Sequence, residues 1–255
     1  MSEGYYGHYG TLGLATPQAN PTAEIEFRAL LPPRVACATV RMVSADREPA
    51  NRLRAYFQNI AETLQRFDTL PLRAVALACT GSTYLLGHAS VEQSLTELSQ
   101  ARGHPVVSAA AAIEDALRFI GAGSIALTCP YPDWLLNAAE EHWQARGFGV
   151  ADQFSLNPQQ GDTRAIYALS PERAAEAITA RWQQVKADAY LITGTGLPTL
   201  RLIADLSAVL PGPVLSSNLC LAWAALRDGG IDFAEHQPSG NFPLLAGWQG
   251  GIARL

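Results

Sequence analysis

Residues 74–82 read Ala74-Val-Ala-Leu-Ala-Cys79-Thr80-Gly81-Ser82, and residues 188–196 read Asp188-Ala-Tyr-Leu-Ile-Thr193-Gly194-Thr195-Gly196. Each segment is an apolar run of strand length that ends in small, hydroxyl-bearing and glycine residues. A second match follows each at a similar distance: Pro105-Val-Val-Ser108 before Ala116-Leu-Arg118, and Pro213-Val-Leu-Ser216 before Ala225-Leu-Arg227. Self-similarity of this kind indicates an internal repeat. We therefore expect two related halves facing one cleft, with a thiol, Cys79, from one turn and no side chain, Gly194, from the other.

The rest of the chain alternates strand-like and helical patterns, which predicts β-α-β units and mostly parallel sheets. The apolar runs are nearly continuous, as in strands covered on both faces. The expected fold is α/β, with two pseudo-symmetric Rossmann-like (flavodoxin-like) halves. The predicted strands are Thr11–Thr16, Arg34–Val40, Ala74–Ala78, Pro105–Val107, Ser124–Leu127, Ala189–Ile192 and Gly212–Leu215; the predicted helices are Asp46–Phe67, Val91–Arg102, Ala110–Ile120, Trp134–Arg146, Pro171–Lys186, Leu197–Leu210 and Leu219–Asp228.

Open parallel sheets bind ligands beyond the carboxyl ends of their strands. This rule selects five segments as candidates to line the cleft: Thr16–Asn20, Cys79–Ser82, Thr128–Tyr131, Thr193–Thr195 and Ser216–Cys220. We expect residues 1–104 and about 211–255 to form the first half, and residues 105–210 the second. The polar, turn-rich segment Gly147–Thr163 is expected to be a surface loop, or a mobile loop over the cleft.

Composition limits the function. Hydrophobic residues make up 48% and charged residues 16% of the 255 residues, which suits a folded core. The net charge of −5, without a cluster of Lys and Arg, argues against a nucleic-acid partner. No apolar run has the length of a membrane span, and the N-terminal residues lack a signal-peptide pattern, so a cytoplasmic protein is expected. A homo-oligomer is left open.

The four cysteines are scattered without C-x-x-C spacing, which gives little support to a metal site or a disulfide framework. Cys37 is expected to be a buried small hydrophobe, and Cys220 a packing residue early in its helix. Cys79 differs because it ends a strand among turn and hydroxyl residues. Backbone N–H groups and the dipole of the following helix are expected to lower its pKa.

Four stretches together resemble the aspartate/glutamate racemase superfamily, within it the maleate cis-trans isomerase and arylmalonate decarboxylase branch. They are Leu14-Ala-Thr16-Pro17-Gln-Ala-Asn20-Pro-Thr22-Ala-Glu24, Ala78-Cys79-Thr80-Gly81-Ser82, Leu127-Thr128-Cys129-Pro130-Tyr131 and Thr193-Gly194-Thr195-Gly196-Leu197-Pro198. The resemblance implies catalysis without a metal or organic cofactor. It also implies a cysteine in each half for racemases and maleate isomerases, and one, normally in the second half, for arylmalonate decarboxylases. This chain has its cysteine in the first half.

The resemblance and the residues together give a candidate site. Cys79 is the candidate catalytic residue, acting as acid, base or nucleophile. Amide and hydroxyl donors around it would bind a carboxylate or an enediolate. The candidate substrate-binding residues are Asn20, Thr80, Gly81, Ser82, Tyr131, Gly194 and Thr195. Asn20 is equally well read as a turn residue, and Tyr131 as a half-buried aromatic. Ser216 and Ser217 fit ordinary helix capping.

A single positioned thiol suits a reaction that needs one proton donor, whereas racemisation needs a group on each face of the carbon. The leading interpretation is a cofactor-independent decarboxylase of a small malonate-type diacid, whose enediolate Cys79 protonates. The alternative is cis-trans isomerisation of a maleate-type diacid with Cys79 as nucleophile. A second alternative is a small-carboxylate binding module. In each case the expected partner is a small dicarboxylate.

Overall fold

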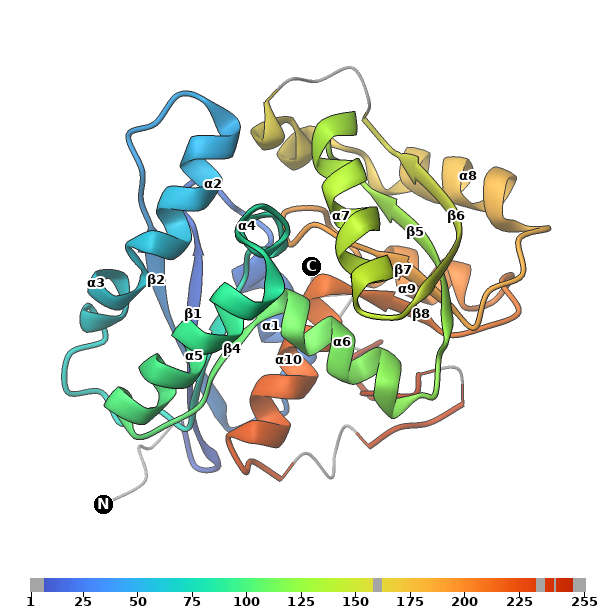
Figure 1. Cartoon of the computed structure of the whole chain (residues 1–255). Coiled ribbons are helices and arrows are strands. Elements are labelled where there is room, and N and C mark those ends of the chain that lie inside the picture. Colours follow the sequence, from blue (N-terminus) through green and yellow to red (C-terminus); the bar gives the residue numbers. More distant parts are fainter. Residues whose placement is uncertain (1–6, 158–161, 233–236, 241, 250–255) are drawn as a thin grey trace.

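The computed structural model describes residues 7–157, 162–232, 237–240 and 242–249, which form two α/β halves side by side (Figure 1). Each half contains a parallel sheet of four strands, in the order β2-β1-β3-β4 and β6-β5-β7-β8. The strands are β1 (Gly10–Pro17), β2 (Val35–Met42), β3 (Ala74–Leu77), β4 (Val106–Ser108), β5 (Ser124–Cys129), β6 (Gly149–Ser155), β7 (Ala189–Ile192) and β8 (Val214–Ser216). The predicted fold class is confirmed.

Helices connect the strands and cover the sheets. They are α1 (Ala23–Leu30), α2 (Pro49–Gln58), α3 (Ile60–Gln65), α4 (Thr80–Leu86), α5 (His88–Arg102), α6 (Ala109–Phe119), α7 (Asp133–Ala145), the 3-10 helix η1 (Thr163–Ala168), α8 (Pro171–Trp182), α9 (Leu200–Leu206) and α10 (Ser217–Asp228). The central strands β3 and β7 are buried along their whole length, as their uninterrupted apolar sequences predict. The predicted helices did not include α1, and the helix expected after Cys79 was given no bounds; α1 has eight residues and α4 has seven.

The internal repeat corresponds to a structural repeat. Cys79 comes two residues after the end of β3, and Gly194 two residues after the end of β7, so they occupy equivalent turns. The next strand in each half ends in a serine that caps a helix. Ser108 Oγ accepts a hydrogen bond from the N–H of Ala111 at 3.2 Å, and Ser216 Oγ from the N–H of Leu219 at 3.3 Å. The capping role expected of Ser216 is thus what the structure shows.

The strands divide between the halves differently from the predicted boundaries. β4 pairs with β3 in the first sheet and β8 with β7 in the second, although the predictions placed residues 105–107 and 212–215 in the opposite halves. Gly103 and Pro105 mark a tight helix-to-strand turn and not a break between halves, because Gly103 adopts φ 71° as the C-cap of α5. The return to the first half is made by α10, which packs on α1, α6 and β3.

Three further expectations differ from the structure. Part of the segment Gly147–Thr163, expected to be a loop, forms β6, a partly exposed edge strand paired with β5. Residues 158–161 of that segment lie outside the described residues. The long helix predicted over Asp46–Phe67 is divided at Asn59 into α2 and α3. Cys37 is exposed on the edge strand β2 and is not buried.

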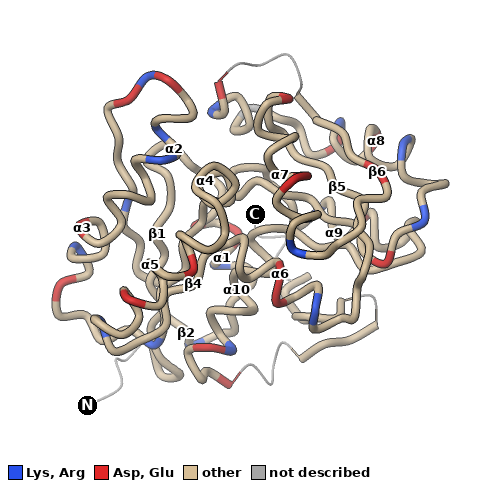
Figure 2. The backbone as a smooth tube through the Cα atoms, in the orientation of Figure 1, with Lys and Arg blue, Asp and Glu red and all other residues tan. Residues whose placement is uncertain are grey.

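Charged residues of both signs are interspersed along the chain (Figure 2). A search of the described residues finds no helix with the length and apolar character needed to cross a membrane.

Candidate active site

Cys79 lies in the turn between β3 and α4. Helix α4 lies on the side of the first half that faces the second half (Figure 1). Its side chain is buried and lines a small cavity of about 50 Å³. The turns after β1, β3, β5 and β7 all reach this cavity, as expected for strands that end at the same edge of each sheet. The lining residues include Pro17, Asn20, Cys79, Thr80, Gly81, Tyr131, Leu135, Gly194, Thr195 and Gly196.

The structure brings together every predicted site residue except Ser82 around this cavity. Ser82 does not line it. Its buried hydroxyl lies behind Cys79, with Oγ 3.1 Å from Cys79 Sγ, and donates a hydrogen bond to the backbone oxygen of Leu53 at 2.6 Å. Ser82 is the third residue of α4, and at that position of the helix its side chain does not reach the cavity. The sequence pattern alone could not show this orientation.

Thr80 and Tyr131 form a polar pair across the two halves. Thr80 Oγ1 and Tyr131 Oη are 2.5 Å apart, and both side chains are buried. Burial raises the pKa of Tyr131 well above its ordinary value, so the phenol keeps its proton at neutral pH. One of these two hydroxyls donates to the other, so one proton of the pair is free to bind an oxygen atom of a ligand.

Asn20 and Thr195 form a second polar pair on the cavity wall. Asn20 Oδ1 accepts the N–H groups of Thr22 (2.9 Å) and Ala23 (3.1 Å), which is the turn role considered from the sequence. Its amide nitrogen donates to Thr195 Oγ1 at 3.2 Å. Thr195 in turn donates to the backbone oxygen of Ala78 at 2.7 Å. Asn20 is therefore both a turn residue and a lining residue, with a second amide hydrogen still available.

Two charged residues that the sequence did not single out, Arg52 and Arg164, also line the cavity. Arg52 of α2 is almost wholly buried, and its Nη2 lies 2.7 Å from Asp162 Oδ1, so an ion pair joins the two halves. Asp162 also accepts from Arg164 Nη2 at 2.6 Å. Hydrogen bonds from Arg164, opposed by partial burial, lower the pKa of Asp162 to about 2. The only sequence signal was the pattern Asp162-Thr-Arg164 in a polar segment, which has no distinctive spacing.

Two tyrosines, Tyr56 of α2 and Tyr167 of η1, also line the cavity. Burial, together with the nearby Cys79, raises the pKa of Tyr56 to about 12. Burial raises the pKa of Tyr167 as well. Both phenols are therefore neutral at physiological pH, and Arg52 and Arg164 supply the positive charge among the described lining residues.

The pKa of the Cys79 thiol is raised, contrary to the expectation from its place at a helix start. Burial is the largest cause. The side-chain contact with Ser82 and the N–H groups of Ser82 and Gly81 oppose it without overcoming it. The helix dipole has little to add because α4 has only seven residues. Cys79 is therefore a protonated thiol at neutral pH.

The backbone conformation at position 194 favours glycine. Its φ is +103°, a value that residues with a side chain rarely adopt. A Cβ built on it would lie 3.0 Å from Ile166 Cδ1 and 3.0 Å from Pro130 Cδ. The second turn therefore lacks a thiol for a structural reason, which the sequence repeat alone did not reveal.

Glu26 of α1 fixes the two halves together behind the cavity. Its buried carboxylate accepts the N–H of Leu200 at 3.0 Å and the side-chain amide of Asn218 at 2.7 Å. It also accepts the N–H and the hydroxyl of Thr199, at the start of α9. Burial raises the pKa of Glu26, and these donors act against the rise.

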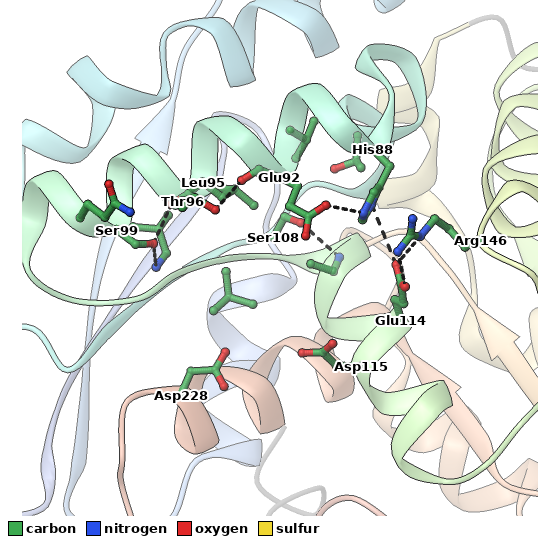
Figure 3. A pocket seen from close by; sticks show the side chains of 16 residues that line it. His88, Glu92, Leu95, Thr96, Ser99, Ser108, Glu114, Asp115, Arg146 and Asp228 are labelled. Atoms are coloured by element: carbon green, nitrogen blue, oxygen red, sulfur yellow. Dashed lines mark hydrogen bonds and ion pairs between the residues drawn. The ribbon is translucent and has the colours of Figure 1, made fainter.

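A second and larger hollow, of about 390 Å³, lies between α5, α6 and the edge strand β4 (Figure 3). His88 Nε2 lies 2.9 Å from Glu92 Oε2, and Arg146 Nη2 lies 2.6 Å from Glu114 Oε1. Glu114 is paired with Arg146, and the lining does not include Cys79 or its predicted partners. Size alone therefore does not identify the reactive site. No cluster of His, Cys, Asp or Glu within the described ranges is arranged to hold a metal ion.

Comparison with known proteins gives consistent matches. A family model described as arylmalonate decarboxylase matches residues 49–241. The maleate isomerase of Geobacillus stearothermophilus is 29% identical over 232 residues, covering 85% of this chain and 90% of that protein. The maleate isomerase Iso of Pseudomonas putida S16 superposes with a TM-score of 0.80 at 22% identity, covering 94% of this chain and 99% of that one.

A further solved structure is a cysteine-to-serine mutant of the Nocardia farcinica maleate cis-trans isomerase with a covalently bound succinylcysteine intermediate. It has a TM-score of 0.74 and 23% identity, and covers 87% of this chain and 93% of that one. At this identity the structural matches establish the fold.

Proposed function

Because this chain belongs to the arylmalonate decarboxylase family, we propose that it acts on a small dicarboxylate through Cys79, and that the reaction is cis-trans isomerisation of a maleate-type diacid. Three relatives matched by sequence over most of their length are named maleate isomerases, which supports this reaction over the decarboxylation that the sequence first suggested. The similar solved structures include both maleate isomerases and arylmalonate decarboxylases. The observation that carries the proposal is the position of Cys79 between two sets of polar groups in one small cavity.

The cavity offers a separate site for each carboxylate of such a diacid. Thr80 and Tyr131 would hold one carboxylate, and the free amide hydrogen of Asn20, near Thr195, would help to hold the other. Arg52 and Arg164 line the cavity and favour binding of an anion. Both pair with the single carboxylate of Asp162, so the three side chains together carry a net positive charge. The small volume restricts the substrate to a few carbon atoms.

The reaction can be followed atom by atom. The Cys79 thiol first loses its proton to solvent, and the thiolate then forms a C–S bond to one alkene carbon. The displaced π electrons move onto the adjacent carboxylate as an enediolate, where hydrogen bonds from Thr80 and Tyr131 stabilise the growing charge. The former double bond is now single and rotates. The electron pair then returns, the C–S bond breaks, and the trans diacid leaves with the thiolate restored.

This route does not need the second thiol that position Gly194 lacks. Addition, rotation and elimination neither consume nor release a proton once the thiolate has formed. Thr195, the hydroxyl beside Gly194, is already committed as a donor to Ala78 and would not serve as an acid. In the Nocardia farcinica mutant a covalent succinylcysteine is present although one cysteine has been replaced, which supports the addition step.

The test is incubation with maleate in deuterated water, followed by proton NMR. We expect fumarate to appear, and Cys79→Ala to lower the rate by at least roughly 10²–10⁴-fold while the protein remains folded. Mass spectrometry of the wild-type protein with maleate should show one added diacid, absent from Cys79→Ala. Retention of more than about a tenth of the rate by Cys79→Ala would rule out the assignment. Diacid binding without any turnover would instead favour the carboxylate-binding module.

Decarboxylation of a malonate-type diacid remains a second candidate, because Cys79 is a protonated thiol, the form that a proton donor requires. The pH dependence separates the two reactions. If the thiolate is the nucleophile, kcat/KM rises with pH until it passes the raised pKa of Cys79. If the thiol is the acid, kcat/KM is constant at neutral pH and falls above that pKa. Phenylmalonate as substrate provides the matching product assay.

A further inference from the structure

Ser82 makes a contact with the reactive thiol that its place outside the cavity does not suggest. Its side chain is 2% exposed, and its Oγ lies 3.1 Å from Cys79 Sγ. The same oxygen lies 2.6 Å from the backbone oxygen of Leu53, in the first turns of α2. Ser82 therefore sits between the sulfur atom and a carbonyl group, with both partners buried.

The number of protons fixes the direction of each hydrogen bond. A serine hydroxyl has one hydrogen and two lone pairs, whereas a carbonyl oxygen has no hydrogen to give. The Ser82 hydrogen is thus committed to Leu53, and only lone pairs remain to face Cys79. With the hydrogen held by Leu53, the 3.1 Å contact is favourable when the thiol is the donor. If the hydroxyl instead turned its hydrogen to the sulfur, the contact would lower the pKa of Cys79, so the sign of the effect distinguishes the two arrangements.

We propose that Ser82 is a positioning residue that accepts a hydrogen bond from the Cys79 thiol and thereby holds it protonated and fixed in direction until the thiol reacts. The proposal rests on Cys79 being the reacting group of the proposed function. It adds a control that the mechanism above does not contain: the thiolate forms only against the Ser82 bond. The carbonyl that sets the direction belongs to α2, the helix whose Arg52 bridges to the second half.

Among the described residues that line the cavity, Cys79 is the group expected to titrate between neutral and moderately alkaline pH. Tyr131 after β5, Tyr56 of α2 and Tyr167 of η1 all keep their protons in this range, because burial raises the pKa of each. Arg52 and Arg164 stay positively charged. A shift in the titration of Cys79 can therefore be attributed to the residue that has been changed.

The sign of the shift in Ser82→Ala tests the proposal. Loss of an acceptor from the thiol should lower the pKa of Cys79, by about half to one unit, so that alkylation near neutral pH becomes roughly 3- to 10-fold faster. The pKa is read from the pH dependence of alkylation by iodoacetamide, in a Cys37→Ala background that removes the exposed cysteine. The S–H stretching band assigned to Cys79 should also move to higher frequency, as expected for a thiol freed from a hydrogen bond.

Thr83→Val is the matched control. Thr83 is the next residue of α4 and is buried to the same extent, and its hydroxyl has no hydrogen-bond partner within the described residues. Its replacement should leave the pKa of Cys79 unchanged, and Ser82→Thr, which keeps the hydroxyl, should behave like the wild type. A higher or unchanged pKa in folded Ser82→Ala would overturn the proposal, because the hydroxyl would then be a donor to sulfur or irrelevant to it. This measurement needs no turnover, so it is independent of which reaction the protein catalyses.

Discussion

Replacement of Gly194 by alanine measures how much a side chain at this turn would lower the free energy of unfolding. A residue with a Cβ at φ +103° costs about 1–3 kcal/mol. The added methyl group would also meet Ile166 and the ring of Pro130 at 3.0 Å, and such overpacking costs about 1–3 kcal/mol. Together these predict that Gly194→Ala lowers the free energy of unfolding by roughly 2–6 kcal/mol. Gly194→Cys, which would recreate a thiol in each half, should lose at least as much.

The assay is urea unfolding followed by circular dichroism, with Gly121→Ala as the matched control. Gly121 also has a positive φ, +73°, but a Cβ there would meet nothing within 4 Å. Its replacement should cost only about 1–2 kcal/mol, and the difference between the two variants isolates the crowding at Pro130 and Ile166. If Gly194→Ala is no less stable than Gly121→Ala, the close approach is not real, and glycine at position 194 would need another explanation.

Two other substitutions test the site and its support. Tyr131→Phe should lower kcat more than it raises KM, because the Tyr131–Thr80 pair is proposed to bind charge that grows toward the enediolate; steady-state kinetics with maleate measures the split, and a change in KM alone would contradict that role. Glu26→Leu should lower the free energy of unfolding by roughly 3–5 kcal/mol, since buried donors of Leu200 and Asn218 lose their acceptor. Glu26→Gln keeps one acceptor oxygen and should lose less in the same urea titration; equal losses for the two variants would show that hydrogen bonding to Glu26 is not what stabilises this contact.

The parts of the fold that sequence predicted well are those with strong local patterns. β3 and β7 are short apolar runs followed by small residues, so the repeat and the shared cavity could be found from composition and spacing. β6 was missed because an edge strand with one partly exposed face has a polar sequence that resembles a loop. Gly103 was misread as a boundary because glycine serves equally as a helix C-cap and as a linker residue.

Local sequence patterns predicted some properties of the site and not others. The residues of the strand-end turns converge on the cavity, as the topology requires. The ion pair between Arg52 and Asp162 depends on a contact between residues far apart in the chain, which no local pattern encodes. The pKa of Cys79 was predicted in the wrong direction, because helix geometry can be inferred from sequence whereas the depth of burial cannot. Ser82 was assigned to the substrate for the same reason: its type was informative and its orientation was not.

The position of α10 has a consequence for how the protein is made. This helix follows the last strand of the second sheet, yet it packs on α1, α6 and β3 of the first half. During synthesis the first half therefore emerges from the ribosome long before the helix that covers part of its core. Its apolar surface stays open to water, or to a chaperone, until residues 217–228 have been translated. We expect folding to be completed late and as a whole, with slow steps set by these distant contacts.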